Sequence, residues 1–373
     1  MDQVRWGIMG AGGIARRFAR ALEQVEGARL VAVSGRRAER LDAFAEGFPV
    51  DEARRYASVE DDGASAHARL AEDPDVDAVY LALPHGMHEV WAARLLRAGK
   101  AVLCEKPAVL SEREALHIAE VARETGTLFM EAMKPRFMPA REQVKALIEG
   151  GELGAVTSLD IAHRVDYGDQ TGRYLLDAAQ GGTLYDLGCY GVAWAEDVLA
   201  GEAEVEACRT RWMAASDGGF VDIADDVRLR IGGVPVHLDF VGDADEFAAV
   251  CRIVCERGEI EVPLLHRPVS YIVRRDGCED ELTCAPAVVD DFYGEVAHFC
   301  DLVRSGAPES PVMPLASTVR DARIIDAIRA AWKRDERCHA GRCHASGEQA
   351  DRPMDDTLRT GDVPAGADGE DGR

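Results

Sequence analysis

The stretch Gly10-Ala11-Gly12-Gly13-Ile14-Ala15 lies between an apolar run at residues 6–9 and an amphipathic segment at 14–25. It places the pattern G-x-G-x-x-A where a first strand would pass into a first helix. In such a turn Gly10 permits the tight bend, Gly12 lets a pyrophosphate approach the backbone, and the small Ala15 lets the helix pack on the strand. The helix N-terminus also offers free N–H groups to phosphates. All six residues are therefore predicted to form a dinucleotide-binding turn.

Around this turn, short apolar runs alternate with amphipathic segments up to about residue 134. The apolar runs lie at 6–9, 30–33, 76–83, 101–104 and 128–133, and the amphipathic segments at 14–25, 38–44, 87–98 and 115–124. This alternation is typical of a parallel sheet with helices on both faces. Residues 1–134 are therefore predicted to form a Rossmann dinucleotide-binding domain of the α/β class, with the polar segment 56–71 as a surface insertion.

The pattern changes after residue 134. A strand is predicted at 156–165, and helices at about 140–149, 183–199, 291–304 and 317–333. Between 203 and 285 apolar and polar residues alternate and are interrupted by Gly- or Asp-containing turns, as in an antiparallel sheet. Residues 135–334 are therefore predicted to form an α+β domain, built on a mostly antiparallel open sheet, for substrate binding and dimerisation. Residues 335–373 lack apolar periodicity and are predicted to be a disordered tail.

Charge and hydropathy exclude several classes of partner. The 373 residues include 43 Lys and Arg against 67 Asp and Glu, a net charge of −24. This balance argues against nucleic acid and against anionic lipid as partners. No apolar stretch approaches the ~18 residues of a membrane helix, so no membrane association is expected. The first residues lack the features of a signal peptide, and the protein is expected in the cytoplasm.

The ten cysteines are scattered and are predicted to be reduced, mostly buried thiols. The pairs Cys338-His339 and Cys343-His344 are too loosely spaced to predict a zinc site. No metal is therefore expected.

The end of the second apolar run distinguishes NAD from NADP. NAD-binding domains usually carry Asp or Glu there, which accepts from the ribose 2′-hydroxyl. This chain reads Val33-Ser34-Gly35-Arg36-Arg37 instead. Because a guanidinium forms charge-assisted hydrogen bonds with phosphate, we expect NADP, with NAD as the second possibility. Arg36 is the expected ligand of the 2′-phosphate, assisted by Ser34 and Arg37; alternatively, the arginines only begin a solvated helix.

Three further motifs stand out. Cys104-Glu105-Lys106-Pro107 follows one apolar run, Leu83-Pro84-His85 closes another with His88 just beyond it, and Asp186-Leu187-Gly188-Cys189-Tyr190 lies in the predicted second domain. Together with the glycine turn and the segments 131–137, 310–314 and 323–329, they resemble the family of glucose–fructose oxidoreductase and inositol dehydrogenase (Gfo/Idh/MocA). The resemblance is strongest to the dimeric dihydrodiol dehydrogenase branch and covers about residues 4–333.

The resemblance implies a two-domain NAD(P)-dependent oxidoreductase that acts on CH–OH groups. Its substrates would be sugars, polyols, diols or related carbonyl compounds. In the dihydrodiol branch a tyrosine works with the lysine of Glu-Lys-Pro, and the matching residues here are Tyr190 and Lys106. The resemblance also implies a homodimer or higher homo-oligomer that forms through the open sheet. An oligomer would cover the broad apolar surface that we expect on the open face of that sheet.

The chemistry of this pair can be stated from the residues themselves. Alcohol oxidation needs a base for the hydroxyl proton, and carbonyl reduction needs the same group as an acid. A tyrosine pKa of about 10 is too high for a good base, and a nearby cation lowers it. Lys106 would supply that charge and polarise the substrate oxygen. Asp186 lies one helical turn before Tyr190 and either orients Lys106 or binds a substrate hydroxyl. The alternatives are a half-buried helical tyrosine and a surface lysine.

Other candidates follow predicted strands, where open α/β sheets bind ligands. The expected cofactor contacts there are Leu83, Pro84, His85, His88, Glu105 and Lys106. His85 is expected near the nicotinamide or ribose, or else it caps the next helix. His163 is predicted to touch substrate along with Lys106, Asp186 and Tyr190, and Arg164 is a weaker candidate. Lys134 stands where the dihydrodiol branch carries an aromatic residue, which favours a polar or anionic sugar-like substrate.

A second class of function is a non-catalytic NAD(P)-binding sensor or regulator on the same fold, since a fold does not dictate a function. A regulator has no chemical need for Lys106, Asp186 and Tyr190 together. The sequence therefore favours an enzyme.

Overall fold

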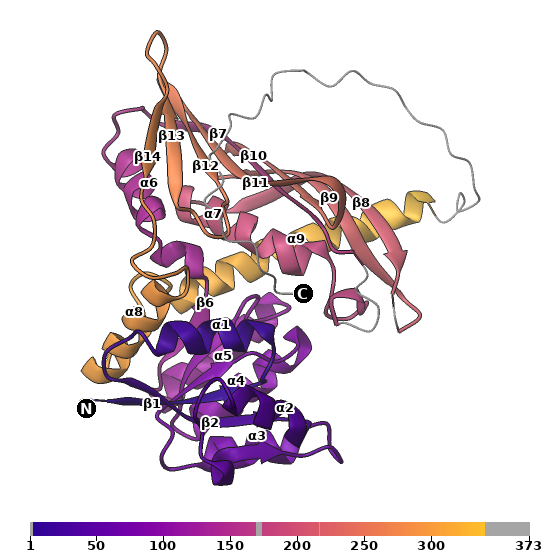
Figure 1. Cartoon of the computed structure of the whole chain (residues 1–373). Coiled ribbons are helices and arrows are strands. Elements are labelled where there is room, and N and C mark those ends of the chain that lie inside the picture. Colours follow the sequence, from indigo (N-terminus) through magenta and orange to yellow (C-terminus); the bar gives the residue numbers. More distant parts are fainter. Residues whose placement is uncertain (1–2, 169–173, 216, 340–373) are drawn as a thin grey trace.

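The first part of the chain forms a six-stranded parallel sheet. The structure, a computed structural model, describes residues 3–168, 174–215 and 217–339, with only the backbone of 333–339. The strand order is β3-β2-β1-β4-β5-β6, so the order reverses between β1 and β4 (Figure 1). The strands are β1 Val4–Met9, β2 Ala28–Gly35, β3 Arg55–Ala57, β4 Ala78–Leu81, β5 Ala101–Glu105 and β6 Phe129–Ala132. This arrangement confirms the predicted Rossmann-type fold.

Helices cover both faces of this sheet. They are α1 Gly13–Leu22, α2 Ala38–Ala45, α3 Ala64–Glu72, α4 His88–Arg97 and α5 Glu112–Thr125. Phe18 of α1 and Phe44 of α2 belong to the buried cluster on one face, and Leu95 of α4 and Ile118 of α5 to the cluster on the other. The near-continuous apolar strands predicted such two-sided burial.

The segment 56–71 is not a surface insertion, and that prediction was wrong. It supplies most of β3, which pairs in parallel with β2, and most of α3. The α3 residues Ala66, His67 and Leu70 are buried, and Leu70 packs so closely on β1 that a Cβ on Gly7 would lie 3.0 Å from its Cδ2 atom. The polar residues that suggested an insertion occupy the loop before α3, while the helix itself completes the layer.

The second part of the chain is built on an eight-stranded sheet of order β14-β13-β12-β11-β7-β10-β9-β8. The strands are β7 Val156–Asp166, β8 Ala203–Ala214, β9 Phe220–Ile231, β10 Val234–Val241, β11 Asp243–Cys255, β12 Gly258–Pro263, β13 Ser270–Arg274 and β14 Glu281–Cys284. Only β7 and β10 pair in parallel, so the predicted mostly antiparallel sheet is confirmed. Its helices are α6 Pro139–Glu149, α7 Cys189–Val198, α8 Tyr293–Ser305 and α9 Leu315–His339.

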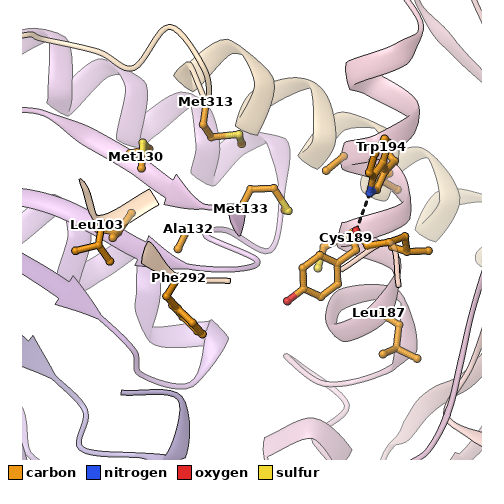
Figure 2. Close-up of a cluster of buried hydrophobic side chains, with 14 of the residues drawn as sticks. Leu103, Met130, Ala132, Met133, Leu187, Cys189, Trp194, Phe292 and Met313 are labelled. Carbon is orange, nitrogen blue, oxygen red and sulfur yellow. Dashed lines mark hydrogen bonds between the residues drawn. The ribbon is translucent and has the colours of Figure 1, made fainter. Parts of the chain in front are cut away.

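The two parts share one hydrophobic core. Helix α7 lies against the sheet so closely that a Cβ on Gly191 would sit 2.8 Å from the ring of Phe240. Figure 2 shows Met130 and Met133, from β6 and the residue after it, in the same buried cluster as Cys189 and Trp194 of α7. Helix α8 returns to pack on α1 and β1, and α9 packs on α5 and β6. The last two helices therefore fasten the second sheet to the first.

The face of the large sheet that points away from the Rossmann part is charged. The prediction of a broad apolar surface on this face was therefore wrong. Figure 1 shows α7 and α9 on the opposite side of this sheet. On the outer side Arg252 pairs with Glu261 at 3.4 Å, Arg274 with Glu259 at 2.8 Å, and His237 lies 3.1 Å from an oxygen of Asp226. The alternation of the strands sends their apolar side chains inward and these charges outward.

Two predictions fall wholly or partly outside the described residues. The backbone of α9 is helical as far as His339, so the first residues of the predicted tail, 335–339, belong to a helix. Residues 340–373 lie outside the described residues. Cys343 and His344 belong to that part of the chain. Within the described residues, no helix is both long and apolar enough to span a bilayer.

We predict that Leu70→Ala lowers the free energy of unfolding by about 2–5 kcal/mol, because it removes a fully buried side chain between α3 and β1. Leu116→Ala on α5, where the side chain is 52% exposed, is the matched control and should change it by less than about 0.5 kcal/mol. Urea unfolding followed by circular dichroism measures both. Equal, small effects would mean that α3 is peripheral after all.

Candidate active site

The glycine turn has the geometry that a dinucleotide requires. Gly10 has φ +101°, and a Cβ there would lie 2.4 Å from the carbonyl oxygen of Ala82, so only glycine fits. A Cβ on Gly12 or Gly13 would meet nothing within 4 Å, which leaves space beside the backbone. Gly12 caps α1 without any side-chain hydrogen bond, so the first N–H groups of the helix remain available for phosphate. Ala15 is buried against the sheet, as its small size predicted.

A cavity of about 170 Å³ opens from this turn at the point where the strand order reverses. Open α/β sheets bind ligands at such a point. Of the predicted cofactor residues, it is lined by Gly10, Ala11, Gly12, Arg36, Arg37, Leu83 and Pro84. These residues fit an NAD(P) nucleotide: the glycine turn would hold its pyrophosphate and the arginines its ribose end.

The ribose end of the cavity differs from the prediction in detail. Ser34 is fully buried, and its hydroxyl lies 2.8 Å from Nδ1 of His67 beneath the cavity wall. Arg40, which the sequence analysis missed, lines the cavity from the first turn of α2, beyond Arg36 and Arg37. Its place in the first turn of the predicted helix 38–44, close to the end of the second apolar run, was the available signal. Asp62 and His67 also line the cavity and come from the segment misread as an insertion.

The loop after β4 connects the two halves of the chain. His85 is 3% exposed; its Nδ1 lies 3.0 Å from the carbonyl oxygen of Gln180, and its ring contacts Tyr174 edge-on. The backbone N–H of Gly86 donates to the side-chain oxygen of Gln180 at 2.9 Å. His88 is fully buried, with its ring nitrogens 2.9 and 2.8 Å from the carbonyl oxygens of Pro107 and Leu83. It therefore holds the β4 and β5 loops together and does not line the cavity.

Lys106 follows directly on β5 and reaches across to the second half of the chain. Its ammonium donates to Oδ1 of Asp186 at 2.8 Å and to the Asp186 carbonyl at 2.9 Å. The same nitrogen lies 4.8 Å from the ring centre of Tyr190. Tyr167 on the segment after β7 donates to the other carboxylate oxygen of Asp186 at 3.0 Å. Residues 106, 186 and 190 are thus brought together, and Asp186 orients Lys106.

A π-helical turn, Leu184–Gly188, precedes α7 and carries Asp186. Asp222 of β9 holds its start, because it accepts from the Thr183 hydroxyl at 2.9 Å and from the Leu184 amide at 2.7 Å. A Cβ on Gly182 would overlap Asp222, at 1.9 Å from its carboxylate oxygen. Sequence reasoning missed Asp222 because it is a buried carboxylate on a distant strand. Glu105 is likewise held in place, by the Tyr80 hydroxyl and the Lys106 amide.

Burial and the charges of Lys106 and Asp186 together set the protonation of the site. It raises the pKa of Tyr190 well above its ordinary value, although the charge of Lys106 opposes the shift. Burial would also raise the pKa of Asp186, but the Lys106 ammonium outweighs it and lowers that pKa to about 2. Burial lowers the Lys106 pKa, yet the Asp186 carboxylate raises it overall. At neutral pH the site therefore holds a phenol, an ammonium and a carboxylate.

A pair of histidines lies beside Tyr190. His163 of β7 and His266, which the sequence analysis missed, have nearly parallel rings 5.1 Å apart, and each ring lies about 6 Å from that of Tyr190. Trp194 of α7 fixes the segment that carries His266, because its ring N–H donates to the carbonyl of the preceding Leu265 at 2.8 Å. Nδ1 of each histidine is buried without a hydrogen-bond partner among the described residues.

Two cations considered for substrate binding are already paired. The Lys134 ammonium contacts the Asp291 carboxylate and lies 4.7 Å from the ring centre of Phe292. Asp291 also accepts from Arg17 at 2.6 Å. Arg164 points to the outer face of the sheet, where it pairs with Asp239. Lys134 therefore offers no free charge to an anionic substrate.

We predict that His85, His163 and His266 stay neutral from about pH 5 to pH 8, because burial lowers their pKa values to about 3, 4 and 3. His237 is the internal control, since a hydrogen bond to Asp160 raises its pKa above the ordinary value. A pH titration of the imidazole NMR signals distinguishes them. A buried imidazole that titrates near the ordinary value would contradict the described burial.

Comparison with known proteins agrees with this geometry. Residues 4–133 match the model of an oxidoreductase family with an NAD-binding Rossmann fold, and residues 142–261 match the GFO/IDH/MocA C-terminal domain. Mouse trans-1,2-dihydrobenzene-1,2-diol dehydrogenase is 30% identical over 88% of this chain and 96% of its own. A dTDP-3,4-didehydro-2,6-dideoxy-α-D-glucose 3-reductase of Streptomyces violaceoruber is 31% identical over 88% and 95%.

A solved structure gives the same picture. It is that of a 3-ketoreductase from Actinomadura kijaniata in complex with TDP-benzene and NADP, which superposes with a TM-score of 0.74 at 27% identity. The match covers 88% of this chain and 98% of that chain. The protein therefore belongs to the Gfo/Idh/MocA family of oxidoreductases, as its glycine turn and Glu-Lys-Pro motif predicted.

Proposed function

We propose that this protein is an NADP-preferring oxidoreductase that transfers hydride between the nicotinamide and a sugar, polyol or diol/carbonyl substrate. In this proposal Tyr190 is the general acid/base and Lys106 its electrostatic partner. The observation that carries it is the contact of Lys106, at the end of β5 in the sheet that holds the glycine turn, with both Asp186 and the Tyr190 ring. The reductase and dehydrogenase activities named for the relatives support it.

Lys106 positions and polarises the substrate oxygen. An ammonium has three N–H donors, and the described residues use two of them, both on Asp186. The third is available to the oxygen that becomes, or was, a carbonyl. Because Asp186 fixes the ammonium from two sides, this donor is held in place before substrate arrives.

Tyr190 moves the proton, and the bound nicotinamide supplies or accepts the hydride. Since burial raises the pKa of Tyr190, the hydroxyl is protonated at neutral pH and ready to donate. This protonation state favours carbonyl reduction. In the oxidative direction the substrate hydroxyl must pass its proton to the phenolate, which Lys106 stabilises.

Arginines in the cavity favour NADP over NAD. Arg36, Arg37 and Arg40 line its ribose end, and no acid follows β2 directly. Guanidinium groups bind a 2′-phosphate through charge-assisted hydrogen bonds. This arrangement argues against the alternative in which Arg36 and Arg37 only begin a solvated helix.

The groups near Tyr190 favour a hydroxylated, uncharged substrate. His163 and His266 are neutral imidazoles, and a ring nitrogen of a neutral imidazole can exchange a hydrogen bond with a hydroxyl group. Lys134 stands where the dihydrodiol branch carries an aromatic residue, and its charge is neutralised by Asp291. A sugar or cyclic polyol therefore suits this site better than an apolar aromatic diol or an anion.

We also propose a homodimer or higher homo-oligomer. The large sheet has α7 and α9 on one side only, and its outer face carries the ion pairs described above. An interface on this face would rest on charge complementarity more than on apolar burial, so it would weaken at high salt.

The alternative of a non-catalytic NAD(P)-binding sensor predicts nucleotide binding without turnover. A sensor gains nothing from a lysine that is held beside a buried tyrosine. The turnover assay described next, with the wild type and Tyr190→Phe, separates the enzyme from the sensor.

We predict that Tyr190→Phe lowers kcat for carbonyl reduction by about 10²–10⁴-fold, because the proton donor is removed while the pocket keeps its shape. The loss of NADPH absorbance is followed with a panel of sugar and polyol carbonyl compounds. NADPH binding should not change.

Tyr271→Phe is the matched control, since Tyr271 is a buried tyrosine on β13 whose hydroxyl donates to Gln143 at 3.2 Å. It should keep wild-type turnover. Full turnover by Tyr190→Phe would remove the proposed role, and NADPH binding without turnover of any compound by the wild type would favour the sensor.

A further inference from the structure

An acidic side chain enters the cofactor cavity from an unexpected direction. The residues after β2 that would carry the acid of an NAD site are Arg36 and Arg37. Asp62, from the loop between β3 and α3, lines the same cavity as these arginines. Its carboxylate accepts a hydrogen bond from Nη1 of Arg36 at 2.9 Å.

The loop that carries Asp62 is built by its neighbours. Asp61 accepts from the Ser58 hydroxyl at 2.6 Å and from the Ser65 amide at 2.8 Å, and hydrogen bonds from these serines lower its pKa to about 2. The Ser58 amide donates to the Gly35 carbonyl at 3.3 Å, which ties the loop to the end of β2. Asp62 itself adopts a left-handed conformation, with φ +55°. The carboxylate is therefore set beside Arg36 by the backbone.

We propose that Asp62 sets the balance between NAD and NADP in this protein. It accepts from the ribose 2′-hydroxyl of NAD, in place of the acid that is missing after β2, and it repels the 2′-phosphate of NADP. The chain would then bind both nucleotides, and Asp62 would reduce its preference for NADP over NAD. This inference rests on the proposed NADP-preferring function.

Arg36 is the group that exchanges partners. Its side chain is 61% exposed and that of Asp62 is 69% exposed. A pair so open to water is weak, so Arg36 is easily released from Asp62. A phosphate attracts the guanidinium more strongly than a single carboxylate does, because it carries more charge and more acceptor oxygens. With NADP, Arg36 turns to the phosphate alongside Arg37 and Arg40; with NAD, it stays on Asp62.

The test is to compare Asp62→Asn with the wild-type full chain by calorimetric titration with NADP⁺ and NAD⁺ at one ionic strength. Asparagine has the same shape and tolerates positive φ. The Kd for NADP⁺ should fall by about two- to fivefold and that for NAD⁺ should rise by a similar factor, the range for one exposed charge contact. Asp62→Gly also suits φ +55° and should shift the ratio in the same direction.

Asp42→Asn is the matched control. Asp42, at 60% exposure, is about as exposed as Asp62 and pairs with Arg55 at 3.1 Å, but it does not line the cavity. Both Kd values should stay as in the wild type. An unchanged NADP/NAD ratio in both Asp62 variants, or a wild type that binds NADP⁺ and no NAD⁺, overturns the inference alone. A wild type that binds neither nucleotide overturns the proposed function as well.

Discussion

The contact between Lys106 and Asp186 is the constraint on which the site depends. The lysine belongs to the end of a parallel strand in the Rossmann part, and the aspartate to a helical turn in the second part, 80 residues later. Both side chains are largely buried, at 14% and 20% exposure. A charge removed from water is tolerated only with a close partner, so neither half can shift far without stranding the other's charge. The same bond that joins the halves orients the ammonium beside Tyr190.

Residues from other parts of the two sheets hold this pair in place. Asp222 fixes the start of the π-helical turn, Tyr167 occupies the second oxygen of Asp186, and Tyr80 holds Glu105 next to Lys106. These side chains come from three different strands or strand ends. Lys106 and Asp186 are therefore held in place from behind, and the Tyr190 ring and the ammonium meet where both are largely buried. Burial explains why the tyrosine stays protonated in spite of the cation beside it.

Local patterns in the sequence were enough to predict the Rossmann fold and the antiparallel sheet. They also singled out residues 106, 186 and 190, which the structure brings together and whose roles stay predictions. The glycine turn and Glu-Lys-Pro are contiguous, and their physical roles can be read where they stand. His266 and Asp222 could not be found in this way, because each acquires its role only when distant strands place it beside the π-helical turn or Tyr190. The segment 56–71 was misread because a short edge strand and a helix with few apolar residues resemble a polar loop. That error hid Asp62 and His67.

Gln180 links the nucleotide-binding loop to the second half of the chain. Its backbone and side chain bind His85 and Gly86 from the second half of the chain, and the neighbouring Pro84 and Met87 line the nucleotide cavity. Any movement that separates the two halves at this point must break both hydrogen bonds. The loop that lines the nucleotide cavity therefore cannot move away from the second half of the chain without losing these two contacts, so the shape of the cavity depends on both halves.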